Sequence, residues 1–291
     1  MADNQVVGHQ LVAHQVADRR AASQAAGQNL KDRAATEILA GKGDGIVTAM
    51  MVKTEPEGWE TPQTILVVLA HPDDPEFFCG ATLTRWAQAG HTVHYCLLTR
   101  GDKGVREKAM DPAVLAAKRE VEQRNAADVL GVKDIVFLNY QDGYVVPDLE
   151  NRRAVTRIIR KFKPQIVVTC DPTYVFGDNT INHPDHRAAG QITVDAVFPA
   201  VGNPLFFPEL LLEEGLEPHA VNEIWLAVTG NANTVVDVTE FWEKKIEALH
   251  CHETQISDMN QLDERIRSRR TPDSTPESPR YEEKFRRFKF R

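Results

Sequence analysis

The sequence predicts a Rossmann-like α/β fold, with a mostly parallel sheet and helices on both faces. From Thr64 onward, short β-branched runs alternate with longer stretches of helical pattern, which is typical of βαβ units. Each helical stretch is long enough for a right-handed crossover between two parallel strands. Gly90 and Gly131 stand just past two of these stretches, where glycine often caps a helix.

The elements can be placed in order along the chain. Apolar runs such as Ile65 to Leu69 mark the strands, and the longer helical patterns fill the segments between them. The predicted strands are residues 64–70, 92–99, 134–138, 165–170 and about 223–228. The predicted helices fill roughly 79–89, 112–130, 151–162, 186–198 and 239–252.

The two ends of the chain differ from this central pattern. Residues 1–60 form a predicted helical extension and linker, because helix formers fill the first 43 positions and glycines follow. This segment is either a real extension that packs on the body or on another subunit, or the result of a start codon assigned too far upstream. Residues 61–265 are the predicted catalytic domain. Residues 266–291 are a predicted linker and basic tail, for which we favour a solvated state over an anion or subunit contact.

Composition narrows the class of protein. A net charge of −8 argues against nucleic acid or an anionic membrane as the main partner, so a small-molecule substrate is expected. The four cysteines form no C-x-x-C pair and predict reduced thiols. No run of about 18 apolar residues and no signal-like start occurs, so the cytoplasm is the expected location. The sequence leaves open whether the chain forms a homo-oligomer.

Two clusters of metal-ligand residues predict one zinc site. His71-Pro-Asp-Asp74 follows the first strand, and His183-Pro-Asp-His186 follows the strand at 165–170, at the sheet edge where α/β folds bind ligands. Zinc in a hydrolase usually has three protein ligands and an open position for water. His71, Asp74 and His186 supply such a set, while Asp73 points towards the open position. Of the two histidines that are three residues apart, one can bind metal while the other faces substrate.

Each of these residues alone has an ordinary structural interpretation, as a helix cap or a solvated helix residue. It is the joint occurrence of both clusters that indicates a metal. Cys79 is rejected as a ligand, because the oxygen and nitrogen set is already complete. His250, Cys251 and His252 are adjacent on a predicted helix and point in different directions, so at most one of them faces the pocket.

These motifs resemble the PIG-L or LmbE-like zinc deacetylases, which remove acetyl groups from N-acetylglucosamine units of small glycoconjugates. The resemblance spans about residues 64 to 256, with several motifs in matching order. The motifs are Ala70-His71-Pro72-Asp73-Asp74, Thr99-Arg100-Gly101, Arg119-x-x-Glu122 ahead of Leu130-Gly131-Val132, Asp142, His183-Pro184-Asp185-His186, and Lys245-x-x-Ala248-Leu249-x-x-His252-x-x-Gln255.

The resemblance implies one Zn²⁺ per chain, held by His71, Asp74 and His186, although such a site also accepts other divalent ions such as Fe²⁺. It also implies that Asp73 is the general base. Zinc polarises an amide carbonyl and acidifies water, so a neighbouring carboxylate can take a proton from that water and pass one to the leaving amine.

The same resemblance assigns His183 to the oxyanion, with Asp185 orienting its ring. A cationic His183 would contribute roughly 3 kcal/mol to stabilising the transition state. Arg119, Asp142 and His252 match positions that hold the sugar; for Arg119 and Asp142, a helix-surface Arg and a turn Asp are equally good interpretations.

One departure from the family pattern limits the inference. Pro75 separates Asp74 from Glu76, where many members place Glu directly after the Asp pair, so the helix start and the rim of the pocket differ. The apolar stretch from Val201 to Glu217 is either a lid over the acceptor side or part of the core.

The expected function is therefore hydrolysis of an N-acetyl group from an N-acetylglucosamine-type sugar or glycoconjugate. Two alternatives stay open. One is an amidase that acts on a thiol-glycoside conjugate, as relatives do with mycothiol or bacillithiol conjugates. The other is an inactive, metal-bound assembly module that acts through the N-terminal helices and the basic tail.

Overall fold

The structure is a computed structural model and describes residues 57–104, 110–177 and 179–290. The helices expected within residues 1–43 lie outside the described residues. No helix of the described part is both long and apolar enough to cross a membrane.

A seven-stranded sheet forms the centre of the described part, in the order β3-β2-β1-β4-β5-β7-β6. All five predicted strands are present and pair in parallel, which confirms the predicted fold class. They are β1 (Thr64–Leu69), β2 (Thr92–Thr99), β3 (Asp134–Tyr140), β4 (Ile166–Cys170) and β5 (Glu223–Ala227). Two strands were not predicted, β6 (Thr234–Asp237) and β7 (Glu282–Lys289), and β7 runs antiparallel to both β5 and β6.

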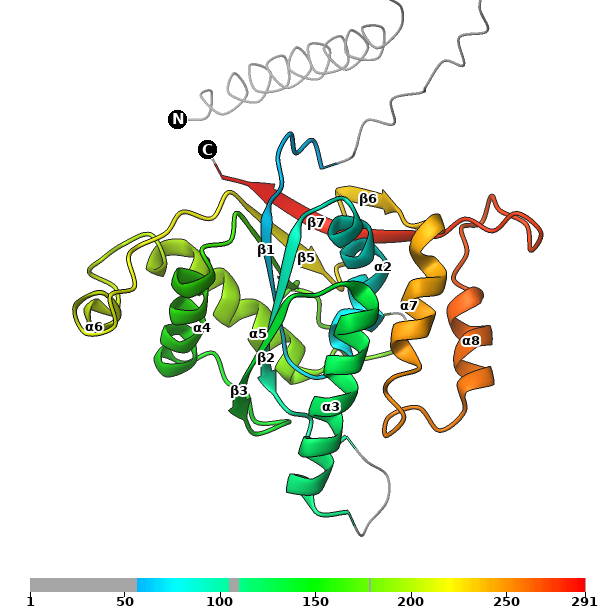
Figure 1. The fold of residues 1–291 in the computed structure, drawn as a ribbon, viewed down its shortest axis with the longest axis horizontal. Helices are drawn as coiled ribbons and strands as arrows, with labels where there is room; N and C mark the ends of the chain where they lie inside the picture. Colours follow the sequence, from blue (N-terminus) through cyan, green and yellow to red (C-terminus); the bar gives the residue numbers. More distant parts are fainter. Residues whose placement is uncertain (1–56, 105–109, 178, 291) are drawn as a thin grey trace, which may run out of the picture. The chain divides into compact units, whose positions relative to one another are not determined.

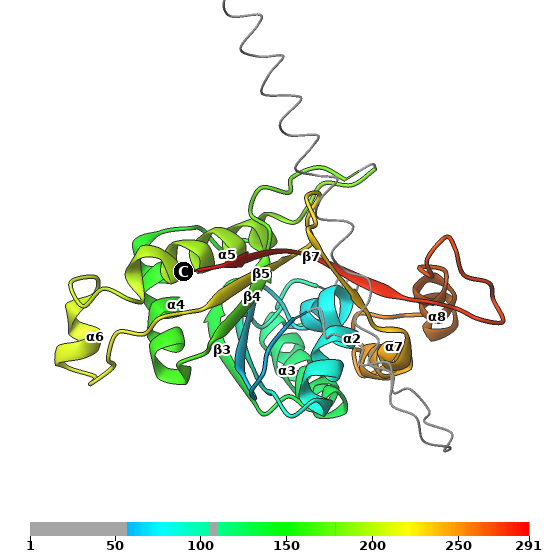
Figure 2. The same ribbon diagram turned by 90° about the horizontal axis from the view of Figure 1, so that it is seen from above.

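Helices cover both faces of the sheet (Figures 1 and 2). The alternation of β1 shows why: Ile65 and Val67 belong to one core cluster, Leu66 and Val68 to the other, and all four are fully buried. On the first face lie α2 (Asp74–Gln88), α3 (Pro112–Leu130), α7 (Trp242–Leu249) and α8 (Met259–Arg267). On the second lie α4 (Leu149–Phe162), α5 (Pro184–Asp195) and the short α6 (Pro208–Leu212), with the π turn η1 (Ala196–Ala200); the 3-10 turn η2 (Thr239–Phe241) precedes α7.

Helix α2 begins five residues earlier than the sequence predicted. Pro75 lies in its first turn, where the missing N–H has no intrahelical partner to lose. The helix then breaks at Cys79, whose φ of −148° and ψ of 16° are not helical. Pro75, which departs from the family pattern, therefore lies at the start of the helix, next to Asp74. The helix start that the sequence predicted, near residue 79, coincides with the kink.

The stretch from Val201 to Glu217, which we expected to form a lid or core, packs beside α4. The buried Arg160 of α4 donates hydrogen bonds to the carbonyls of Ala200, Val201, Asn203 and Phe206. In both ribbon views α6 lies next to α4, away from α2 and α3.

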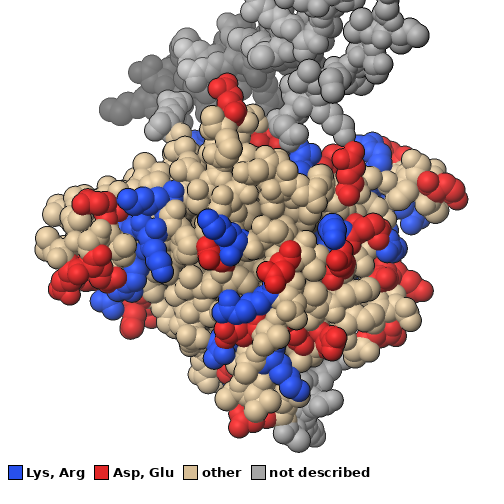
Figure 3. Space-filling model, viewed as in Figure 1, with Lys and Arg blue, Asp and Glu red and all other residues tan. Residues whose placement is uncertain are grey.

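Basic and acidic side chains are mixed across the face shown in Figure 3.

The solvated tail expected after Arg270 is wrong for residues 282–289. Phe285 of β7 is fully buried against Trp86 and Trp225, and the guanidinium of Arg287 binds the carboxylate of Glu223 at 2.8 Å. The basic residues that suggested a solvated tail belong instead to a strand inside the sheet. The Glu223 carboxylate of the neighbouring strand β5 neutralises Arg287.

Strand β7 also stabilises the kink of α2. The carboxylate of Glu283 accepts hydrogen bonds from the backbone N–H groups of Ala81 and Thr82, at 3.3 and 2.8 Å, just after the break. N–H groups at the start of a helical segment lack intrahelical partners, so Glu283 caps the second half of α2. Lys245 of α7, only 2% exposed, binds Glu283 Oε1 at 2.6 Å and the Phe77 carbonyl at 2.9 Å.

Replacing Lys245 by methionine should destabilise the protein by roughly 3–5 kcal/mol, because the Glu283 carboxylate would stay buried without its cation. Urea denaturation followed by circular dichroism measures this loss. Lys244→Met is the matched control: the exposed Lys244 pairs with Glu247 on the surface and should contribute less than about 1 kcal/mol. Equal losses in the two variants would contradict a role for the buried pair.

Candidate active site

The two predicted metal motifs meet at the carboxyl edge of the sheet. His71 follows β1, and His186 lies in the first turn of α5, beyond β4. Strands β1 and β4 are parallel neighbours, so their carboxyl ends lie side by side although the motifs are far apart in sequence. Pro184 occupies the first turn of α5 and favours a helix start at that point.

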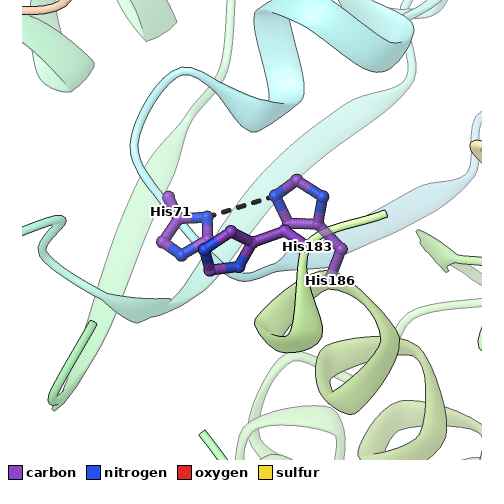
Figure 4. A group of neighbouring side chains, drawn as sticks. All are labelled: His71, His183 and His186. Carbon is purple, nitrogen blue, oxygen red and sulfur yellow. Dashed lines mark hydrogen bonds between the residues drawn. The ribbon is translucent and has the colours of Figure 1, made fainter. Parts of the chain in front are cut away.

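Three side chains bring donor atoms to one point. His71 Nδ1 lies 3.2 Å from His186 Nε2 and 3.3 Å from Asp74 Oδ2, and His186 Nε2 lies 3.0 Å from Asp74 Oδ1. Figure 4 shows the rings of His71 and His186 turned towards each other, with His183 beside them. Ligands about 2.0–2.2 Å from a tetrahedral zinc ion are roughly 3.3–3.6 Å apart. The observed separations of 3.0 to 3.3 Å lie at or just below this range, so a small outward shift of the nitrogen and oxygen donors would fit a single divalent cation.

The second ring nitrogen of each imidazole, which faces away from the three donor atoms, has a polar partner of its own. His71 Nε2 lies 3.2 Å from Asp142 Oδ1 and 3.4 Å from Asp185 Oδ2, and His186 Nδ1 lies 3.1 Å from Asn182 Oδ1. Such outer partners fix the orientation of metal-binding histidines and raise their basicity. Sequence reasoning gave Asn182 no role, although it directly precedes the motif that runs from His183 to His186.

The electrostatics of this cluster suit a cation. Burial raises the pKa of Asp74, but His186 and His71 outweigh it and hold that pKa well below its usual range. Burial lowers the pKa of His71, but Asp74, Asp142 and Asp185 outweigh it and raise that pKa well above its usual value. The carboxylates therefore create a negative environment around the His71 imidazole.

Asp73, the expected base, lies beside this cluster at the start of α2. Burial raises its pKa to about 6, while the neighbouring Arg119 guanidinium, whose Nη2 lies 3.2 Å from Asp73 Oδ2, acts in the opposite direction. A carboxyl with a pKa near neutrality is suited to exchange protons in catalysis.

Asp73 lines a cleft of about 660 Å³, a volume typical of small-molecule sites. Its other walls come from the start of α2, from Gly104 and Met110 between β2 and α3, from the segment that joins α7 to α8, and from α8 itself. The lining residues outside Asp73 are Phe77, Gly104, Met110, residues 253–258, Gln261, Leu262 and Arg265. The sequence did not assign the wall between α7 and α8 to a pocket.

The three residues expected to bind sugar lie behind the site. Arg119 is 3% exposed and donates to the carbonyls of Pro72 and Gly101; His252 is fully buried, with its Nε2 3.2 Å from Glu76 Oε2. Asp142 is 6% exposed and contacts His71. The motifs bring these residues to the predicted sheet edge, where Arg119 contacts Asp73 and Asp142 contacts His71. Direct contact of the three residues with sugar stays a prediction.

His183 stands at the metal cluster, with its ring centre 4.7 Å from that of His71. Its Nδ1 accepts a hydrogen bond from the Asp185 backbone N–H at 3.2 Å, so the proton of a neutral ring lies on Nε2. Burial, with the His71 and His186 imidazoles, lowers the pKa of His183 and favours this neutral ring over the expected cation. Asp185 meets His183 through its backbone, and its carboxylate accepts from the N–H groups of Gly143 and Val145 as well as facing His71.

Comparisons with known proteins agree with these motifs. Residues 66–197 match the family described as PIG-L: GlcNAc-PI de-N-acetylase. Diacetylchitobiose deacetylase of Thermococcus kodakarensis is 33% identical over 200 residues, which cover 69% of this chain and 73% of that protein. A second relative, from Kineococcus radiotolerans, is a 1D-myo-inositol 2-acetamido-2-deoxy-alpha-D-glucopyranoside deacetylase. It is 30% identical over 261 residues, which cover 69% of this chain and 71% of that protein.

Among solved structures, N,N'-diacetylchitobiose deacetylase from Pyrococcus horikoshii matches with a TM-score of 0.72 and 29% identity, over 82% of this chain and 88% of that one. The architecture, the position of the motifs and the sequence identities lead to one assignment. The chain belongs to the PIG-L family of de-N-acetylases, the family that its motifs resemble.

Proposed function

We propose that the protein is a metal-dependent hydrolase that removes the N-acetyl group from an N-acetylglucosamine-type sugar or glycoconjugate. The convergence of donor atoms from His71, Asp74 and His186 beside Asp73 carries this proposal. The similarity to deacetylases that act on diacetylchitobiose and on an acetamido-glucoside of inositol supports it.

Zinc is the ion that two imidazoles and one carboxylate suit best. Bound by His71, Asp74 and His186, it would polarise the acetamide carbonyl and lower the pKa of water towards 7. The cleft beside Asp73 has room for the sugar.

Different side chains would carry out the proton transfer and the stabilisation of negative charge. Asp73 takes a proton from the attacking water and returns one to the leaving nitrogen, because an amine leaves poorly without it. The Nε2–H of His183 donates to the carbonyl oxygen as negative charge develops there. Water adds to the carbonyl carbon and the C–N bond breaks, which yields acetate and a free amine. Arg119 holds the carboxylate of Asp73 in place.

Protein stripped of metal with a chelator and then reloaded with zinc tests the proposal. We expect equimolar acetate and amine from N,N'-diacetylchitobiose or from an N-acetylglucosaminyl inositol, with no turnover before reloading. Cleavage of a thiol-derived glycoside conjugate, without action on the acetylated sugars, would instead identify an amidase. A zinc-loaded protein that cleaves neither class would contradict hydrolysis and favour an assembly role.

A further inference from the structure

Asp73 has a backbone conformation that residues other than glycine seldom adopt. Its φ is 82° and its ψ is −27°, and its side chain makes no capping hydrogen bond to α2. An L-residue stays in this region only where surrounding contacts hold it there. The residues that make these contacts therefore determine where the proposed base stands.

Two residues of α3 hold Asp73 from behind. Gln123 Oε1 accepts the backbone N–H of Asp73 at 2.8 Å. Arg119 donates to the Pro72 carbonyl at 2.7 Å and contacts Asp73 Oδ2 at 3.2 Å. Arg119 and Gln123 are four residues apart and so share one face of α3. The carboxylate and the backbone of the base are thus both held by a helix that contributes none of the proposed metal ligands.

The amide of Gln123 is oriented by a second buried contact. Gln123 Nε2 donates to Glu76 Oε1 at 2.9 Å, and Glu76 Oε2 lies 3.2 Å from His252 Nε2. A carboxylate only accepts, so the amide nitrogen faces Glu76 and the amide oxygen faces the N–H of Asp73. Gln123, Glu76 and His252 are all fully buried, which makes any unpaired arrangement unfavourable.

We propose that Gln123 is a positioning residue for the base: it holds Asp73 in the left-handed conformation that sets its carboxylate at the cleft, and Glu76 and His252 hold Gln123. This inference rests on the proposed function, because Asp73 is the base only if the protein is a hydrolase. Gln123 does not touch substrate, since none of its surface is exposed.

Gln123→Met tests the role, because methionine keeps the length of the side chain and removes both hydrogen bonds. With the zinc-loaded enzyme on N,N'-diacetylchitobiose, we expect kcat to fall about 10- to 100-fold, with KM and zinc content nearly unchanged. Gln123→Glu keeps an acceptor for the Asp73 N–H, and the new carboxyl can share a proton with Glu76, so it should retain more turnover than Gln123→Met. Should Gln123→Met fail to fold, a Gln123→Glu variant with its kcat lowered as far as about 100-fold would overturn the proposal.

Two further measurements separate positioning from general stability. In an Asp73→Asn background, Gln123→Met should change the residual kcat less than about twofold, because the base it positions is gone. Leu130→Ala, a core change on the same helix, should lower the melting temperature and leave kcat near the parental value. If the fold-losses in kcat of the two single variants multiplied in the double variant, Gln123 would act on the fold alone, and the proposal would be overturned.

Amide hydrogen exchange gives a readout that needs no activity. Gln123→Met should speed exchange at the backbone N–H of Asp73, compared with Leu130→Ala of similar stability. Unchanged exchange there would overturn the inference even in an active enzyme. An inactive parent protein would instead count against the proposed function, so the two failures can be told apart.

Discussion

Replacement of His186 by alanine should produce a folded protein that retains less than about a tenth of an equivalent of zinc and releases no measurable acetate. The donor atoms of His71, Asp74 and His186 lie 3.0 to 3.3 Å apart, so we expect each to be one corner of a single site. Removal of one corner leaves two protein ligands, too few for a stable catalytic zinc site. Metal analysis after dialysis and the acetate assay measure both effects, and His71→Ala should behave in the same way.

The matched control is His250→Ala, which removes an imidazole that pairs with Asp263 of α8 and that is not among the proposed ligands. This variant should keep its metal and its turnover. A second group of donors, His71 with Asp142 and Asp185, also lies close enough to hold an ion. Full zinc retention in His186→Ala would exclude that residue as a ligand and favour the second group. If the two aspartates only support His71, Asp142→Asn should weaken zinc binding about 10- to 100-fold.

The position of the candidate metal site could be predicted because the topology leaves little choice. Five β-branched runs separated by helical patterns predict a parallel sheet, and the motifs after β1 and β4 must then meet at one edge. The ligand pattern itself is local, since His71 and Asp74 stand on a single turn between a strand and a helix. Both features are encoded by residues that are close in sequence or in neighbouring strands.

The depth of each side chain could not be predicted in the same way. Motif order shows that Arg119 and His252 approach the site, but whether they face sugar or lie beneath the base depends on packing between α2, α3 and α7. Gln123 gave little signal, because an amide on a helix is usually solvated. Its spacing of four residues from Arg119 was the only indication that both share one face.

Strand β7 was missed for a related reason. Its inward positions are Glu283 and Phe285, and a charge at the first of them disguises the alternation that identifies a half-buried strand. The charge is neutralised by Lys245, which lies 38 residues earlier in the sequence. Only the folded chain brings the two together, so local pattern could not distinguish this strand from a solvated tail.

Asp73→Asn should lower kcat by about 10²- to 10⁴-fold while zinc content and the melting temperature stay close to the parental values. Asparagine has the shape of aspartate and can still accept from Arg119, so the turn into α2 should persist. It cannot take a proton from water, however, and the leaving amine would lose its proton donor. Steady-state kinetics on an acetylated amino sugar, with metal analysis of the same sample, measure the separation between binding and turnover.

Asp128→Asn provides the matched change, because Asp128 is an exposed carboxylate of α3 and should affect neither kcat nor zinc. If Asp73→Asn kept its turnover within about tenfold of the parent, Asp73 would not be the base. The proton would then have to pass to another group, and His183 is neutral because burial and its neighbouring imidazoles lower its pKa. Its Nδ1 could take the proton only after releasing the Asp185 backbone N–H. His183→Ala would in that case become the more damaging variant, which reverses the order expected for an enzyme in which Asp73 moves the proton and His183 only stabilises charge.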